Sequence, residues 1–328
     1  MNYDALLVVS FGGPEKREDV MPFLENVLRG KNVPRSRMLG VAEHYYHFDG
    51  RSPINEQNRA LISLLEAELA RDGPKLPVYW GNRNWRPFLA ETMQGMKRDG
   101  VRRALAFVTS AYGSYSGCRQ YLEDIARARA EVGETAPEVD KLRAFYNHPG
   151  FITAWSDRIR EALAQVPDAC LAYTAHSIPI WMARQSRYEK ELQETCALIS
   201  EALGRSGDPL VYQSRSGPPS EPWLEPDILD YLRELASRGV SGAVIAPVGF
   251  LSDHIEVVYD LDVEARALCD QLGLRMVRAA TVSFHPEFIR IIRELILERI
   301  DENRPRRALG TMGLPPDFCP ADCCLRPR

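Results

Sequence analysis

The stretch Ala243-Val244-Ile245-Ala246-Pro247-Val248-Gly249-Phe250-Leu251-Ser252-Asp253-His254-Ile255-Glu256 decides how this chain folds. Its apolar first part predicts a buried strand of a parallel sheet, and Gly249 ends that strand. The polar loop that follows opens a helix, for which Asp253 and Glu256 have the spacing of a capping box. Open α/β sheets bind their ligands at the carboxyl ends of such strands, so this loop is a candidate site.

Short apolar runs of the same kind alternate with helical patterns along the chain. This alternation is typical of βαβ units and a parallel sheet. We therefore expect an α/β fold of two similar doubly wound, Rossmann-like lobes with parallel sheets and a ligand cleft between them. The expected strands are 5–10, 76–80, 103–110, 169–175, 209–213, 242–248 and 275–280, and the expected helices are 20–28, 56–71, 88–98, 152–163, 188–203, 228–238 and 286–300.

The shared pattern divides the chain into two halves and a tail. We expect an N-terminal lobe over 1–146 with ligand-contacting loops, a C-terminal lobe over 147–305 with metal-binding and catalytic residues, and a cysteine-bearing tail over 306–328. A charged segment, 127–141, is expected to separate the halves. Residues 31–59 are expected to form an irregular loop, and such long loops are usually functional.

Composition argues against several classes of protein. The chain has 328 residues, of which 45% are hydrophobic and 26% charged, with a formal net charge of −4. This charge, without a basic stripe interleaved with aromatic residues, argues against nucleic-acid binding. No apolar run approaches the roughly 20 residues that span a bilayer, so we expect no transmembrane segment and a cytoplasmic location. Seven cysteines, an odd number, favour reduced thiols or metal ligation over disulfides.

Histidine and carboxylate side chains gather where two predicted strands end. His176 follows a fully apolar strand, and His254, Glu256 and Asp260 follow the opening strand. Since both strands belong to one predicted sheet, these side chains can face one bound species. Imidazole with carboxylates suits either a borderline metal ion or proton transfer near neutral pH. The alternative is that the acidic residues only cap a helix and that His176 is a hydrogen-bonded loop residue.

Aromatic side chains are the second feature of the predicted cleft. Tyr45, Tyr46, Tyr115 and Tyr121 lie in or beside loops that open toward it. Phenol rings suit a large, flat, apolar ligand with polar tips better than a phosphate. The pair Gly12-Gly13 after the first strand lacks the glycine spacing and the lysine–serine pair of a nucleotide-binding loop.

The C-terminal tail concentrates Cys319, Cys323 and Cys324 within six residues. Three thiolates and one more from elsewhere would complete an iron–sulfur or zinc site. Cys118, in a loop, is the best candidate for the fourth ligand, because the remaining cysteines lie among apolar neighbours where free cysteine is usually inert. The alternative is an exposed tail whose thiols have no function.

Five stretches spread along the chain carry a further signal. They are Ser10-Phe11-Gly12-Gly13-Pro14, Ser52-Pro53-Ile54, Thr174-Ala175-His176-Ser177-Ile178-Pro179, Gln213-Ser214-Arg215-Ser216-Gly217-Pro218 with Pro222-Trp223-Leu224, and Ser252-Asp253-His254-Ile255-Glu256. Together, and in this order, they resemble the ferrochelatases, which insert ferrous iron into a porphyrin. Two variants resemble the actinobacterial branch, which is associated with iron insertion into coproporphyrin III: Glu43-His44-Tyr45 and Tyr115-Ser116-Gly117-Cys118-Arg119-Gln120-Tyr121.

The resemblance implies roles for the histidine and carboxylate cluster. His176 and Glu256 would form both the iron site and the pair that handles protons. Asp260, with His254, would continue an acidic path along the helix. Ferrous iron would then be a substrate of the reaction.

The resemblance also implies a porphyrin site and a cofactor. Ser52 and Tyr121 are expected to contact the carboxylates of the porphyrin. Tyr45 and Arg29 are further expected porphyrin contacts. The tail cysteines resemble those of family members that carry a 2Fe–2S cluster. The expected ligands of the cluster are Cys118, Cys319, Cys323 and Cys324.

Three positions depart from the family pattern. Phe11 stands where some relatives have a tyrosine that can ligate iron, so no oxygen ligand is expected from that side. His44 stands where some relatives have an arginine that meets a propionate, so anchoring would depend on groups such as Arg29. The cysteine that animal enzymes supply early in the second lobe falls near Ala154, so the fourth cluster ligand has to be another residue.

Several alternatives stay open at this point. The porphyrin could be protoporphyrin IX, which has two carboxylates, in place of coproporphyrin III, which has four. The metal could be cobalt, or the chain could be a non-catalytic carrier of tetrapyrrole or metal. A carrier needs affinity but no base, so replacing His176 would leave its function intact. The resemblance also leaves room for transient contacts with neighbouring enzymes of haem biosynthesis.

Overall fold

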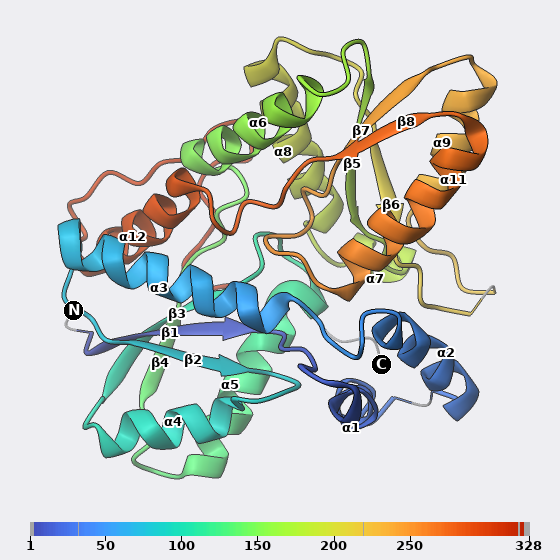
Figure 1. The fold of residues 1–328 in the computed structure, drawn as a ribbon. Coiled ribbons are helices and arrows are strands. Elements are labelled where there is room, and N and C mark those ends of the chain that lie inside the picture. Colours follow the sequence, from blue (N-terminus) through green and yellow to red (C-terminus); the bar gives the residue numbers. More distant parts are fainter. Residues whose placement is uncertain (1–2, 32, 219, 321, 325–328) are drawn as a thin grey trace.

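The computed structural model describes residues 3–31, 33–218, 220–320 and 322–324. Over these residues the chain forms two parallel sheets, each of four strands (Figure 1). The N-terminal sheet has the order β2-β1-β3-β4, with β1 (Ala5–Ser10), β2 (Val78–Asn82), β3 (Arg103–Val108) and β4 (Glu138–Lys141). The C-terminal sheet repeats this arrangement as β6-β5-β7-β8, with β5 (Cys170–His176), β6 (Leu210–Gln213), β7 (Gly242–Ala246) and β8 (Arg275–Arg278). The α/β fold with two similar parallel-sheet lobes is confirmed.

Helices cover both faces of each sheet (Figure 1). The N-terminal half contains η1 (Arg17–Asp19), α1 (Val20–Val27), α2 (Arg35–Tyr46), α3 (Ile54–Asp72), α4 (Leu89–Arg98), the π-helix η2 (Tyr115–Arg119) and α5 (Gln120–Val132). The C-terminal half contains α6 (Pro149–Leu163), α7 (Ile180–Arg184), α8 (Tyr188–Leu203), α9 (Ile228–Ser237), α10 (Ile255–Val257), the π-helix η3 (Val258–Ala265), α11 (Arg266–Leu272) and α12 (Pro286–Ile300).

The apolar strands are buried on both faces, which is why they appear in the sequence as unbroken hydrophobic runs. In β1, Leu6 and Val8 pack into a core that includes residues of α3 and α12. Leu7 and Val9 point the other way, into a core with residues of α4 and α5. Successive side chains of a strand alternate in this manner, so each sheet is doubly covered.

Two elements differ from the sequence expectation. Helix α2 lies within 31–59, where an irregular loop was expected. The helix was missed because only Met38 and Ala42 of its twelve residues are buried, so its hydrophobic period is weak. It packs on α1, and we call these two helices the lip; they lie at the edge of the N-terminal half (Figure 1). Strand β4 occupies part of the charged segment 127–141, which was expected to be only a connection.

One hydrophobic cluster spans the two halves. It includes Leu65 of α3, Phe107 of β3, Trp155 of α6 and Phe288 of α12, so α12 joins both lobes. The lobe boundaries expected from the sequence, 146/147 and 305/306, fall outside all of the helices and strands. Among the described residues, none of the helices has the length and apolarity to cross a membrane.

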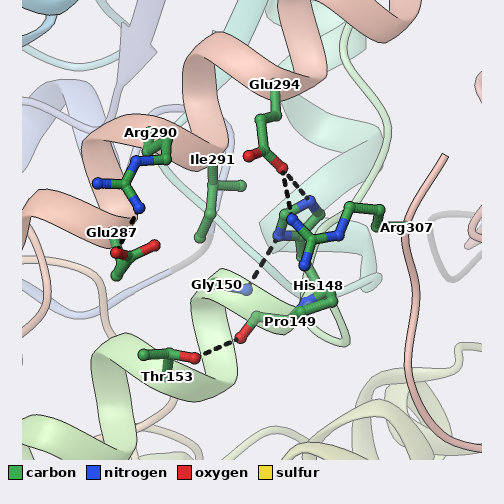
Figure 2. Close-up of a pocket in the computed structure, with 9 residues that line it drawn as sticks. All are labelled: His148, Pro149, Gly150, Thr153, Glu287, Arg290, Ile291, Glu294 and Arg307. Carbon is green, nitrogen blue, oxygen red and sulfur yellow. Dashed lines mark hydrogen bonds and ion pairs between the residues drawn. The ribbon is translucent and has the colours of Figure 1, made fainter. Parts of the chain in front are cut away.

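The chain that follows α12 is tied to the start of α6 (Figure 2). His148 caps α6, because its Nδ1 accepts a hydrogen bond from the Gly150 amide at 3.2 Å. Its Nε2 lies 3.2 Å from Glu294 Oε2, and Arg307 Nη1 lies 3.4 Å from the same oxygen. Burial lowers the pKa of His148 to about 3, so the imidazole is neutral and its Nε2 hydrogen faces Glu294. The small pocket lined by these residues is therefore a structural junction.

Candidate active site

His176 is the last residue of β5, one of the two inner strands of the C-terminal sheet. Its register partner on β6 is Gln213, so the two side chains leave the sheet side by side. The His176 side chain is 28% exposed, and its Nε2 lies 3.5 Å from Glu256 Oε1. The structure thus brings together the two residues that the sequence places at the ends of two strands.

The loop after β7 positions Glu256, but not through the capping box predicted from the sequence. The N-cap residue of α10 is His254, whose Nδ1 accepts a hydrogen bond from the Glu256 amide at 3.2 Å. Asp253 instead forms an ion pair with Arg278, Oδ1 to Nη1 3.0 Å. The prediction of an Asp253 cap was therefore wrong, because the partly buried Arg278 on β8 attracts this carboxylate more strongly than a backbone amide does. The Glu256 carboxylate is left free of any capping role.

The π-helix η3 sets the position of Asp260. A π-helix has a wider turn than an α-helix and is frequently found at functional sites. Ser214 Oγ donates a hydrogen bond to Asp260 Oδ2. Gln213 Nε2 donates to the Glu256 backbone oxygen at 2.7 Å and approaches Asp260 Oδ2 at 3.5 Å. The strand end at 213–214 therefore holds both acidic residues, a role for Gln213 and Ser214 that the sequence reasoning missed.

The charges of His176 and Glu256 stabilise each other. Burial alone would lower the pKa of His176, but the charge of Glu256 and the hydrogen bond to it raise this pKa to about 9. Burial alone would raise the pKa of Glu256, but the facing His176 lowers it to about 2. At neutral pH the pair is therefore an imidazolium and a carboxylate. His176 must lose a proton before it can accept one.

Two further carboxyl groups, those of Asp260 and Glu264, follow this pair on η3. Burial raises the pKa of Asp260 to about 7, against the hydrogen bond from Ser214, and the Glu256 charge adds to the rise. Burial also raises the pKa of Glu264, four residues further along η3, and the charge of Asp227 contributes. Glu264 and Asp227 were not singled out in the sequence, although Glu264 continues the spacing of Glu256 and Asp260.

His44 of the lip crosses to the C-terminal half. Its ring stacks on that of Tyr259, with centroids 3.8 Å apart and planes 10° apart, and His47 meets the same ring edge-on at 5.9 Å. Tyr259 directly precedes Asp260, so the lip contacts the π-helix that carries Asp260 and Glu264. Tyr45 packs against Phe23 in the lip, at a centroid distance of 5.6 Å.

The other expected porphyrin contacts lie in different environments. Arg29 is exposed and donates to Asn26 Oδ1 at 2.5 Å. Ser52 is buried against Gly13, where a Cβ atom would approach the Ser52 side chain to 2.7 Å. Tyr121 is buried under the Arg83 guanidinium, 4.4 Å from its ring centroid. Arg29 is therefore open to solvent, whereas Ser52 and Tyr121 are almost entirely covered.

The four cysteines predicted as cluster ligands lie together. The thiol of Cys118, in η2, forms a hydrogen bond with that of Cys319, which raises the pKa of Cys118 and lowers that of Cys319. Cys319 also contacts Cys323, whose Sγ lies 3.6 Å from that of Cys324. Cys118 therefore lies beside a tail cysteine, and its role as the fourth cluster ligand stays a prediction. Residues 321 and 325–328 of the tail lie outside the described residues.

Neither cluster is arranged as a finished metal site. In the parts of the chain that the structure describes, no group of three or more His, Cys, Asp or Glu side chains is placed to hold a metal ion. The His176–Glu256 pair offers two ligands and an acid beside them. Of the four thiols, Cys118 lies beside Cys319, and Cys323 lies beside Cys324.

Two solved structures share this two-lobed fold. The sirohydrochlorin chelatase SirB from Bacillus subtilis subspecies spizizenii, in complex with cobalt, matches with a TM-score of 0.55 at 11% identity, over 91% of this chain and 94% of that chain. SirB from Bacillus subtilis with Fe3+ matches with a TM-score of 0.58 at 10% identity, over 90% and 95%. At such low identity the likeness concerns the fold alone. In fold class, the protein is thus an α/β protein built like the chelatases.

Sequence comparison narrows this class to one family. The family model described as Ferrochelatase matches residues 3–300. A ferrochelatase from Rhodopirellula baltica is 55% identical over 98% of this chain and 93% of its own length. Coproporphyrin III ferrochelatases from Nocardia farcinica and Frankia alni are 48% and 51% identical, over 100% and 99% of this chain and 98% and 87% of theirs. The chain belongs to the ferrochelatase family of metal-inserting enzymes, as the five sequence stretches indicate.

Proposed function

We propose that this protein inserts Fe2+ into coproporphyrin III and so produces Fe-coproporphyrin III (coproheme) for haem biosynthesis. The observation that carries the proposal is the His176–Glu256 pair, 3.5 Å apart, beside an Asp260 whose pKa is raised to about 7. Metal insertion needs charge for a dication, a base and an outlet for protons, and these three groups supply them. The names of the relatives from Nocardia farcinica and Frankia alni support coproporphyrin III as the porphyrin.

Insertion exchanges one ferrous ion for two pyrrole protons, and the ion pair explains how the exchange starts. The Glu256 charge is what keeps His176 protonated in the free enzyme. An iron ion that shares the Glu256 carboxylate weakens this effect, so the pKa of His176 falls and its proton leaves. The neutral imidazole can then accept the first pyrrole proton.

Asp260 is the proposed outlet for protons and the entry for hydrated iron. Because its pKa is raised to about 7, it exists in both protonation states near neutral pH. Ser214 and Gln213 hold its carboxylate beside the Glu256 backbone. Glu264 extends the path toward Asp227, and His254 lines its start.

Replacing Asp260 with asparagine tests this role through stability as well as turnover. The raised pKa means that the folded protein binds this proton more tightly than the unfolded chain, so stability falls as pH rises from about 4 to about 7. We expect Asp260→Asn to gain on the order of 1 kcal/mol in free energy of unfolding at pH 8, nothing at pH 4, and to insert iron more slowly. Denaturant titrations at both pH values check this; an equal change at both would contradict it.

The porphyrin contacts are part of the proposal. Arg29 is exposed and cationic, so it suits a propionate, and Tyr45 offers a ring from the lip. Ser52 and Tyr121 are buried, so a carboxylate reaches them only when the side chains that cover them move. Iron insertion into protoporphyrin IX is the alternative reaction.

One experiment separates these possibilities from a carrier and from cobalt insertion. Purified protein is incubated without oxygen with Fe2+ or Co2+ and with each porphyrin, and absorbance follows metalloporphyrin formation. We expect turnover with Fe2+ and coproporphyrin III to exceed the other combinations. Binding of porphyrin without turnover in all combinations would favour the carrier.

We also propose that the cysteine site holds a 2Fe–2S cluster as a structural cofactor. Such a cluster needs four thiolates, and Cys118, Cys319, Cys323 and Cys324 are drawn together from η2 and the tail. The 3.6 Å between the last two sulfur atoms is close to the roughly 3.7 Å between two thiolates on one tetrahedral metal with bonds of about 2.3 Å. When bound, the cluster would cross-link η2 to the tail. A zinc ion is the alternative occupant.

The remaining proposals concern the setting of the reaction. The seven cysteines are all free thiols in the structure, which supports a reducing, cytoplasmic location. We further propose transient contacts with the enzymes that supply the porphyrin and receive the product.

A further inference from the structure

Helix α8 begins at a contact with the catalytic strand. Tyr188, its first residue, is buried and donates a hydrogen bond from its hydroxyl group to the backbone oxygen of His176 at 2.9 Å. The Ser177 amide of the same peptide group donates a hydrogen bond to the Gln213 oxygen at 2.8 Å. The direction of the His176 side chain therefore depends on a hydrogen bond from α8 as well as on the sheet.

One turn further along, α8 contacts the segment that leads to the first cysteine. Glu191 is 4% exposed, and its Oε2 accepts a hydrogen bond from the Gly113 amide at 2.6 Å. Gly113 lies between β3 and η2, the turn that carries Cys118. A buried carboxylate is costly unless it is hydrogen-bonded, so this contact fixes the segment firmly.

After another turn, α8 contacts the segment that leads to the tail cysteines. Glu194 Oε1 accepts hydrogen bonds from the amides of Thr311 at 2.7 Å and Met312 at 2.8 Å. The carboxylate fills the place of a side chain at Gly310, where a Cβ atom would lie 2.6 Å from Glu194 Cδ and where φ is +77°. Only glycine suits this position.

We propose that α8 couples the cysteine site to the catalytic histidine, with Tyr188 as the positioning residue of His176 and with Glu191 and Glu194 as anchors of the two cysteine-bearing segments. The inference rests on the proposed function for the roles of His176 and of the thiols. Residues three positions apart are neighbours on a helix surface, so Tyr188, Glu191 and Glu194 follow one another along α8, and the anchors lie within about 9 Å of rise from Tyr188. A change in the position of the cysteine-bearing segments would therefore shift α8 and, through Tyr188, the backbone at His176.

Three variants test the coupling in the full-length protein. Tyr188→Phe removes the hydroxyl group and keeps the ring, Glu194→Gln weakens the hold on the tail, and Cys323→Ser changes the cysteine site. Lys190→Gln and Gln193→Ala, both exposed on the same helix, are the matched controls. The first readout is amide hydrogen exchange at 176–178 in porphyrin-free protein, and the second is the change in kcat compared with the KM for porphyrin.

All three variants are expected to speed exchange at 176–178 by about three- to ten-fold, while the controls leave it unchanged. Tyr188→Phe should lower kcat by a similar factor and leave the KM for porphyrin unaltered, which general destabilisation would not do. Because Glu194 acts through Tyr188, the double variant should exchange no faster than Tyr188→Phe alone.

Two results would overturn the coupling. One is unchanged exchange at 176–178 in Glu194→Gln and Cys323→Ser, and the other is a double variant whose effects simply add. The exchange measurement needs no turnover, so it decides the coupling even where the unchanged protein fails to insert iron. Such a failure would count against the proposed function instead.

Discussion

A Glu256→Gln variant is expected to bind porphyrin normally and to insert iron on the order of 10³-fold more slowly than the unchanged protein. The amide keeps the size of the side chain but cannot attract a dication. In the unchanged protein, the charge of Glu256 raises the pKa of His176 against the effect of burial. Without this charge the pKa falls, so the imidazole of the variant is neutral near pH 7. The variant therefore keeps a base and loses the iron site.

This combination separates the two roles of the pair. If proton transfer alone limited the reaction, a neutral His176 would preserve or raise the rate, so a large loss shows that Glu256 acts on iron. Porphyrin fluorescence titration checks binding, metalloporphyrin absorbance checks turnover, and Glu134→Gln, at an exposed position far along the chain, is the control. A purely capping Glu256 would cost about 1 kcal/mol of stability and leave turnover intact. An active variant would falsify the assigned role.

Much of the fold is predictable because the inner strands of both sheets, β1, β3, β5 and β7, are almost entirely buried. The runs 5–9 and 242–246 contain no polar residue, so they are easily recognised as buried strands in the sequence. Strand β4 escaped prediction because it is a partly exposed edge strand, Glu138–Lys141, whose pairing with β3 decides its conformation. Helix α2 escaped because tertiary packing against α1 compensates for a weak apolar stripe.

The sequence is enough to predict that His176 and Glu256 lie near each other, but not which contacts hold them in place. Parallel strands bring their carboxyl ends to one edge, which is enough to place His176 near Glu256. The sequence cannot show that Asp253 pairs with Arg278, because that partner lies on another strand. The wider turn of η3 is equally invisible, since the apolar period of 255–265 suits an ordinary helix. The contact of Tyr188 with His176 could not be predicted either, because its hydroxyl group binds a backbone oxygen, which no sequence pattern marks.

A Cys323→Ser variant is expected to lose the visible colour of the purified protein and to lose on the order of 2–5 kcal/mol of stability. The bound cluster would close a loop of about two hundred residues between Cys118 and the tail, and constraining the unfolded chain in this way is worth that amount. A serine hydroxyl is a poor replacement for a thiolate ligand. Absorbance before porphyrin is added, iron and sulfide content, and denaturant unfolding provide the measurements.

The structure sharpens this prediction, because the tail has other anchors. Arg299 Nη1 lies 3.2 Å from Asp317 Oδ2, and Glu194 holds the amides of Thr311 and Met312, so part of the tail stays docked without a cluster. The loss of stability should therefore come from the segment beyond Asp317, and limited proteolysis should cut there first. Cys170→Ser, at a thiol outside the site, should keep both colour and stability. A colourless unchanged protein that binds one zinc ion would instead assign these thiols to zinc, because both metals accept the same four ligands and differ in colour.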